Sequence, residues 1–183
     1  LKQPFRVLFR DLAEKTTTLR ESEEKYRLLV ENVSDVVYSV SLDGVFNYLS
    51  PAWEKTLGYS ASEMINRSYH SIIHPDDLPA SQLFLDQVIR IGESQSDFEY
   101  RVLHKDGSWR WFMASASIVR NVEDEAVSFI GIARDISDRK QTELIQAARL
   151  RLLEVASKYS LAELLRATLD ECEKLTESQA GFY

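Results

Sequence analysis

Hydrophobic positions near the start of the chain recur every seven residues. An apolar seven-residue repeat sustained over about four heptads is typical of a helix that pairs with another helix. We therefore predict a helix over residues 1–32 that joins two copies of the chain. A single amphipathic helix packed on its own domain is the alternative. The residues assigned to the seam of the dimeric helix are Phe5, Leu8, Leu12, Leu19, Tyr26 and Leu29.

From residue 36 the period of the apolar residues shortens to two. Residues 36–40 and 45–49 are rich in β-branched and aromatic side chains, and an Asp-Gly pair lies between them. This pattern predicts a β-hairpin, because both turn residues tolerate positive φ. We expect Ser50 to cap the short helix that follows, with Pro51 at its first position.

Short helices and three further strands are expected after this hairpin. Ser60 and Glu63 have the spacing of a capping box. The acidic residues at 76–77 suit the start of a longer helix that ends near Gly92. Alternating patterns then predict strands over residues 98–102, 109–119 and 127–134. Two strands, several helices and three strands in that order predict an α+β fold with an antiparallel sheet.

The pattern returns to helical spacing after residue 134. We expect an exit helix over residues 140–159. Ser160 and Glu163 have the spacing of another capping box, so a separate and strongly amphipathic helix is expected to begin there. The apolar face of that helix needs a partner surface, either on its own domain or on a neighbouring chain.

Composition and charge limit the class of partner. Hydrophobic residues make up 44% of the chain and charged residues 28%, as in ordinary globular proteins. A net charge of −7 disfavours nucleic acid, which needs clustered cations. No apolar run approaches the ~18–20 residues that cross a bilayer, so we expect a cytoplasmic chain without membrane contact. Because it begins at Leu1 and ends on Phe182 and Tyr183, we interpret the chain as a piece of a multidomain protein.

A set of short segments resembles a PAS sensor domain with its C-terminal PAC motif, over about residues 33–139. In chain order they are Asp43-Gly44, Ser50-Pro51-Ala52-Trp53, Leu57-Gly58-Tyr59-Ser60, His74-Pro75-Asp76-Asp77, Lys105-Asp106-Gly107-Ser108-Trp109-Arg110-Trp111 and Gly131-Ile132-Ala133-Arg134-Asp135-Ile136-Ser137. The resemblance implies a five-stranded antiparallel sheet with short helices on one face, flanked by long N- and C-terminal helices. It also implies that Asp135, Ile136 and Ser137 match the Asp-Ile-Thr motif that joins the last strand to the exit helix.

Residues 160–183 resemble the opening of a GAF domain. The order of helix, PAS domain, helix and GAF domain is similar to that of bacterial signalling proteins, such as sensor histidine kinases of two-component systems and cyclic-dinucleotide enzymes. The resemblance therefore implies a downstream GAF or output domain as the partner of this chain in its parent protein.

The resemblance also raises haem and flavin as cofactors, and the residues favour neither. Haem-binding relatives place a histidine on the long helix beside the sheet, whereas residues 76–91 contain none. Flavin photochemistry in relatives uses a cysteine in an Asn-Cys-Arg context, whereas Cys172 lies outside the PAS region. The three histidines lack metal-ligand spacing, and no phosphate-binding or nucleophile motif occurs. We therefore predict no cofactor, no metal and no enzymatic activity for this chain.

A ligand pocket is the remaining candidate site. Residues 114–117 place small side chains in the middle of a predicted strand, which leaves room for a small molecule. The alternative is that bulky neighbours close over them and form a packed core. The candidate lining residues are Tyr38, Trp53, Phe84, Val88, Tyr100, Phe112, Ser115, Ser117 and Phe129.

The function that we predict is signal relay through helices that flank the PAS domain in a homodimer. A change in the core would shift the sheet edge near Asp135 and re-register the exit helices. Three alternatives stay open: a dedicated small-molecule receptor, a dimerisation scaffold, and a fragment of an enzyme whose catalytic part lies elsewhere in the parent.

Overall fold

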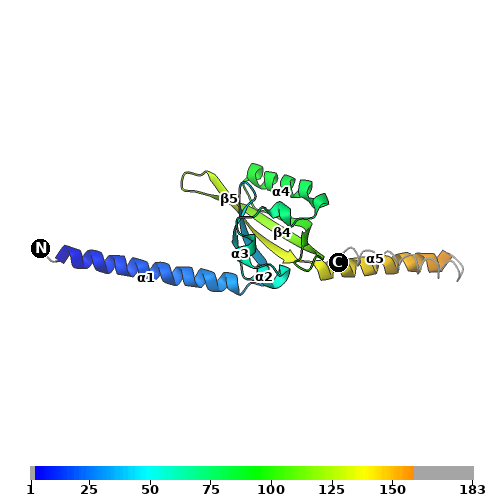
Figure 1. The fold of residues 1–183 in the computed structure, drawn as a ribbon, viewed down its shortest axis with the longest axis horizontal. Coiled ribbons are helices and arrows are strands. Elements are labelled where there is room, and N and C mark those ends of the chain that lie inside the picture. The colour runs from blue at the N-terminus through cyan, green and yellow to red at the C-terminus, as the bar shows by residue number, and fades with distance from the viewer. Residues whose placement is uncertain (1–2, 159–183) are drawn as a thin grey trace. The chain divides into compact units, whose positions relative to one another are not determined.

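The computed structural model describes residues 3–158, and Figure 1 shows its ribbon. The chain divides into two units, Leu1–Ser34 and Asp35–Tyr183, and each is described by itself. The predicted helix from Ser160 and the GAF-like segment lie outside the described residues. Within residues 3–158, no helix is both long enough and apolar enough to cross a bilayer.

The first unit contains helix α1, Gln3–Glu31. Three of the predicted seam residues expose more than half of their surface: the exposed fraction is 60% for Leu19, 66% for Tyr26 and 58% for Leu29. The other three predicted seam residues lie on the N-terminal part of α1, where the backbone alone is described, and they are Phe5, Leu8 and Leu12. The pairing of this helix with a second copy stays a prediction.

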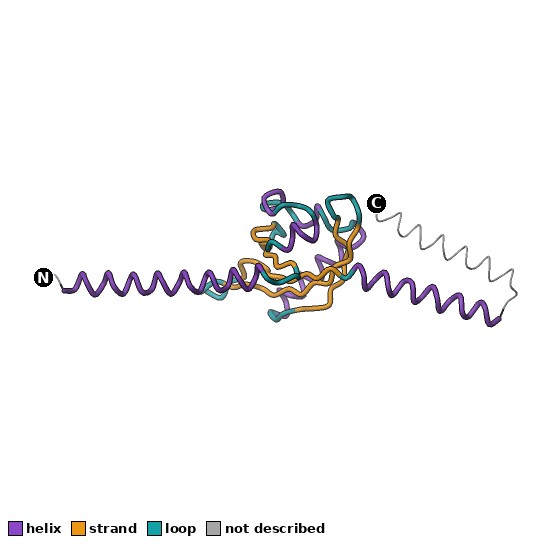
Figure 2. The backbone as a smooth tube through the Cα atoms, turned by 90° about the horizontal axis from the view of Figure 1, so that it is seen from below, coloured by secondary structure: helices purple, strands orange, loops and turns teal. Residues whose placement is uncertain are grey.

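The second unit is built on a five-stranded antiparallel sheet, which confirms the predicted α+β class and the PAS-like sheet. The strands lie in the order β2-β1-β5-β4-β3, and Figure 2 shows them in orange. Since β5 lies between β1 and β4, the segment that leaves β5 starts beside β4. The bounds are β1 Val36–Ser41, β2 Phe46–Leu49, β3 Gln95–Leu103, β4 Trp109–Arg120 and β5 Ala126–Asp135.

Short helices connect β2 to β3. Helix α2 packs on β1, and helix α4 packs on β3 and β4. Ser60 and Glu63 form the predicted capping box at the start of α3. Gly58 and Gly92 end α2 and α4 as left-handed caps, and the end of α4 at Gly92 agrees with the prediction. The bounds are α2 Ala52–Leu57, α3 Ala61–Met64, the 3-10 helices Tyr69–Ser71 and Pro75–Asp77, and α4 Leu78–Ile91.

The prediction that Ser50 caps α2 is wrong. The N-cap residue of α2 is Pro51, which offers no side-chain hydrogen bond. The buried Ser50 hydroxyl instead accepts a hydrogen bond from the N–H of Val37, at an N–O distance of 3.0 Å. A buried strand amide needs a partner, and here the serine side chain supplies it.

Candidate functional site

A cavity of about 60 Å³ lies between the sheet and helices α2 and α4. Its walls are mostly apolar or aromatic, and they come from β1, β3 and β4 as well as from the two helices. Five of the predicted pocket residues line this cavity: Tyr38, Trp53, Phe84, Tyr100 and Phe112. The strands and helices that carry them are far apart in sequence, so the cavity exists only in the folded unit.

Ser115 and Ser117 do not line the cavity, which corrects the sequence prediction. The buried face of β4 carries Phe112, Ala114 and Ala116, each of which is 1% exposed. Because side chains alternate along a strand, the two serines lie on the opposite face of the sheet. The small residue that does line the cavity is Ala114.

Two other predicted pocket residues lie in the core without lining the cavity, and they are Val88 and Phe129. An aromatic stack lines one wall of the cavity. The ring of Phe98 lies between those of Phe84 and Tyr100, with centroid distances of 4.8 and 5.2 Å. Offset stacking of this kind adds stability beyond the burial of area alone. The stack ties α4 to β3 across the cavity wall.

The polar groups of the cavity walls are few and uncharged. Burial raises the pKa of Tyr38 to about 12, and burial also raises the pKa of Tyr100 well above its ordinary value. Ser81 donates its hydroxyl hydrogen to the carbonyl of Asp77, at 2.8 Å. The indole N–H of Trp53, a residue that is 4% exposed, has no hydrogen-bond partner among the described residues. The cavity therefore offers neutral donors and acceptors in a low-dielectric setting.

The predicted relay residues join the sheet to the exit helix. Helix α5, Ser137–Lys158, begins two residues after the end of β5. The N–H of Ile136 donates to the carbonyl of Trp111 at 2.8 Å, and the N–H of Trp111 donates to the Ser137 hydroxyl at 3.0 Å. An Asp135 carboxylate oxygen accepts from the N–H of Ser137 at 2.8 Å. The start of α5 thus continues the pairing of β5 with β4.

Side chains of the sheet hold the first turn of α5 as well. The ammonium of Lys140 lies 5.2 Å from the centre of the Trp111 ring, and the guanidinium of Arg101 lies 5.5 Å from the same ring. Lys140 and Arg139 both form ion pairs with Glu99 of β3. The hydrogen bond from Lys140, with a further one from Arg139, lowers the pKa of Glu99. We call Glu99, Arg101, Trp111 and Lys140 the exit clamp.

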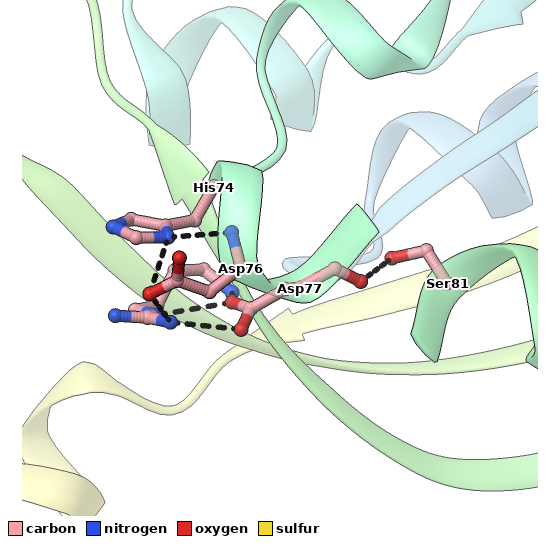
Figure 3. A network of polar contacts seen from close by, with 5 residues as sticks. His74, Asp76, Asp77 and Ser81 are labelled. Atoms are coloured by element: carbon pink, nitrogen blue, oxygen red, sulfur yellow. Dashed lines mark hydrogen bonds and ion pairs between the residues drawn. The ribbon is translucent and has the colours of Figure 1, made fainter. Parts of the chain in front are cut away.

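Figure 3 shows a polar network around Asp77, which includes His74, Asp76 and Ser81. Through Ser81 and Arg101 this network connects the cavity wall to the exit clamp. Arg101 donates two side-chain hydrogen bonds to the Asp77 carboxylate, at 3.0 and 2.8 Å. Burial raises the pKa of Asp77, but the hydrogen bonds from Arg101 outweigh it, so the net pKa is lowered. The backbone carbonyl of Asp77 accepts from the hydroxyl of Ser81, which lines the cavity. His74 accepts from the N–H of Asp76 at 3.2 Å and completes the turn before α4.

The sequence pattern predicts neither this network nor the exit clamp. It assigns Asp76 and Asp77 to the start of a helix and does not single out Arg101 or Lys140. The alternation of charged with aromatic residues along β3 was a usable signal, because charges in a strand need partners on the same face. The partners lie at residues 77, 111 and 140, and local spacing does not show that these come together.

Comparison with known proteins finds a matching family and several relatives. Residues 46–133 match the family model described as the PAS fold. White collar 1 protein of Neurospora crassa is 34% identical over 92 residues, which are 50% of this chain and 8% of that protein. Sporulation kinase C of Bacillus subtilis is 26% identical over 164 residues, which are 88% of this chain and 37% of that protein. The chain therefore spans only a minor part of these relatives.

A solved structure agrees with the fold. The crystal structure of a sensory box histidine kinase/response regulator from Burkholderia thailandensis is 26% identical, with a TM-score of 0.55. The match covers 73% of this chain and 98% of that one. By the family match and the sheet order described above, residues 46–133 have the PAS fold.

Proposed function

We propose that this PAS domain is a sensory module that relays a change in its core to the exit helix α5. The observation that carries the proposal is the hydrogen-bonded junction of Ile136 and Ser137 with Trp111. Because the start of the helix is hydrogen-bonded to the backbone amide and carbonyl of a strand residue, the helix follows any movement of that strand. Relatives named as a sporulation kinase and a sensory box histidine kinase contain similar segments, which supports a signalling role.

The route of the relay follows the contacts described above. Ser81 is part of the cavity wall, and its hydroxyl donates to the backbone carbonyl of Asp77, whose carboxylate accepts from Arg101. Arg101 and Lys140 lie against the same Trp111 ring. A shift of α4 relative to β3 therefore changes the geometry at the first turn of α5. A coupling of this kind requires two discrete arrangements of the clamp, which the signal favours to different degrees.

The output side of the proposal lies beyond the PAS domain. The flanking helices pair in a homodimer, and α5 leads to a downstream output domain such as that of a histidine kinase. The exposed Leu19, Tyr26 and Leu29 of α1 are the apolar surface that supports pairing. In this proposal the chain is not itself an enzyme, and the catalytic step belongs to the parent protein.

Asp135→Ala tests the relay. Loss of the hydrogen bond to the Ser137 N–H removes about 0.5–1.5 kcal/mol from the junction. We expect faster amide hydrogen exchange over residues 138–145, with an unfolding midpoint of the PAS core within a few degrees of the original. Asp138→Ala is the matched control, because Asp138 is an exposed aspartate in the first turn of α5 and lies outside the hydrogen-bonded junction.

The relay role of Asp135 fails if Asp135→Ala lowers the stability of the whole PAS core and α5 exchange merely follows that loss. It also fails if α5 exchange is the same in both variants. In either case the residue is structural, and the junction does not uncouple as proposed.

A further inference from the structure

The imidazole ring of His74 is held in place at the start of the 3-10 helix Pro75–Asp77. Its Nδ1 atom accepts a hydrogen bond from the N–H of Asp76 at 3.2 Å and so caps that helix. The ring also packs edge-on against Trp109 of β4, with a centroid distance of 4.5 Å. A ring nitrogen that accepts a hydrogen bond carries no proton, so this arrangement requires the uncharged form of His74.

One oxygen of the Asp76 carboxylate lies within ion-pair distance of two basic side chains. Oδ2 of Asp76 is 3.6 Å from Nδ1 of His74 and 3.5 Å from Nη2 of Arg101. Figure 3 shows the Asp76 carboxylate directed toward the His74 ring. The Asp76 side chain is 75% exposed, so it is free to move between its two partners.

The charged groups around His74 come from two elements. Among the described residues, they are two carboxylates from its own turn, Asp76 and Asp77, and one guanidinium from β3, that of Arg101. Arg101 contacts the Asp77 carboxylate more closely, at 2.8 Å. The neighbour of the ring from β4 is the uncharged side chain of Trp109. Asp76 is therefore the carboxylate that is available to a protonated His74.

Protonation of His74 changes the role of its Nδ1 atom. A protonated Nδ1 cannot accept from the Asp76 N–H, and it donates to the Asp76 carboxylate instead. Arg101 then loses the carboxylate oxygen that it shares with the uncharged ring. Because the Arg101 guanidinium lies 5.5 Å from the centre of the Trp111 ring, this change reaches the exit clamp. Histidine is the residue type whose charge changes between about pH 5 and pH 8.

His104 supplies a comparison within the same chain. Its Nδ1 atom accepts from the N–H of Asp106 at 3.1 Å and lies 2.8 Å from the Asp106 carboxylate, so the local arrangement repeats that of His74. Both histidine side chains are 20% exposed. Within residues 3–158, however, the Asp106 carboxylate forms no ion pair with arginine or lysine. A charge on His104 therefore has no shared carboxylate through which to reach the exit clamp.

We propose that His74 senses pH: as the pH falls it gains a proton, draws the Asp76 carboxylate away from Arg101 and thereby alters the exit clamp. The ligand of this site is the proton, and Asp76 is the group that passes the change on. The inference adds a second input to the relay and rests on the proposed function for its consequence in a parent protein. The response of the clamp itself does not depend on the cavity.

The test is an NMR titration of the 183-residue chain from about pH 8 to pH 5. The ring signals of His74 report its own titration. The indole N–H of Trp111, which Trp111→Phe identifies by its loss, reports the exit clamp, and the backbone N–H of Ser137 reports the start of α5. We expect both N–H signals to shift with the same midpoint as the His74 ring.

Three substitutions separate the steps of this response. His74→Gln removes the titrating group and should abolish the shifts of Trp111 and Ser137. Asp76→Asn removes the shared carboxylate, so the His74 ring should still titrate while most of both shifts is lost. His104→Gln is the matched control, and it should leave both shifts as they are in the unmodified chain.

The inference is overturned if the His74 ring titrates while the Trp111 and Ser137 signals stay in place, or if the ring does not titrate in this interval. It is also overturned if His74→Gln or Asp76→Asn retains the full shifts, or if His104→Gln abolishes them. The unmodified chain decides the first question even where a variant does not fold. None of these readouts uses a change inside the cavity, so such a failure leaves the relay from the cavity standing. A failure of the relay test in turn leaves the response of Trp111 to His74 intact.

Discussion

At the scale of single residues, the position of the Tyr38 ring depends on a glycine. Gly131 of β5 pairs with Tyr38 of β1, and the ring lies across the face of the glycine. A Cβ atom on Gly131 would come 2.5 Å from the Tyr38 hydroxyl oxygen, which is far inside contact distance. The absence of a side chain at residue 131 therefore makes room for the tyrosine that lines the cavity.

Gly131→Ala is expected to displace the Tyr38 ring and to lower the free energy of unfolding by about 1–3 kcal/mol, as overpacking does. Urea unfolding measures this change. In the background of Tyr38→Leu, which removes the ring, the same substitution should lower the stability by much less. Equal losses in the two backgrounds would show that the ring is not what the new methyl group meets.

At the level of single residues, the sequence predicted part of the cavity lining correctly and part of it wrongly. The five predicted residues that do line the cavity are all large and aromatic, and hydrophobic burial makes such residues the safest choice for a cavity wall. The error concerned residues 114–117, which are small on both faces, so their size did not reveal the strand parity. Alanine is more often buried than serine, and that weak preference pointed to Ala114 and Ala116. The Trp53 N–H has no acceptor within residues 3–158, and this depends on tertiary contacts that no local sequence pattern records.

At the scale of elements, the exit clamp is the feature that distinguishes α5 from a helix that simply follows a strand. Trp111 contributes twice, through its backbone to Ile136 and Ser137 and through its ring to Lys140. These two contributions are separable by mutation, because the backbone bonds survive a change of side chain.

Trp111→Leu is expected to loosen the first turn of α5 while β4 and β5 stay paired. Each of the two cation–π contacts stabilises by about 0.5–1 kcal/mol at a partly exposed site, so the first-turn amides of α5 should exchange several times faster. Trp109→Leu is the matched control, since the Trp109 ring packs on His74 at 4.5 Å instead. Similar amide exchange of α5 in both variants would show that the Trp111 ring does not stabilise the first turn of this helix.

The elements themselves were largely predictable. Alternation and turn residues located all five strands within a few positions, and Ser60 and Glu63 capped α3 as their spacing predicts. Ser50, like Ser60, is a serine that precedes a helix, but its hydroxyl accepts a hydrogen bond from the Val37 N–H instead of capping that helix. Which donor a serine satisfies depends on the neighbouring strand. The strand order β2-β1-β5-β4-β3 was not predicted, because the periodicity of a strand does not show which strand lies beside it.

At the scale of the whole molecule, the proposal requires two copies of the chain. Leu19 and Leu28 are both exposed on α1, with fractions of 60% and 52%, but only Leu19 lies on the heptad seam. The dimer proposal can therefore be tested by comparing substitutions of these two leucines, which lie on the same helix.

Leu19→Asp is expected to convert the dimer to a monomer, because a charge at a seam position is buried by pairing. Leu28→Asp should leave the dimer intact. Native mass spectrometry or sedimentation reports both outcomes directly. A monomer before any substitution, or equal effects of the two variants, would mean that the heptad seam does not pair.

The central claim is that a change inside the cavity reaches helix α5. Ala114→Val adds two methyl groups to the cavity wall, whereas Ser115→Val adds similar bulk on the opposite face of the same strand. The decisive measurement is amide hydrogen exchange over residues 138–145 in both variants. The account predicts altered exchange of α5 in Ala114→Val and unaltered exchange in Ser115→Val. Exchange that changes only in α4 and the strands, with α5 as in the unmodified chain, would contradict it.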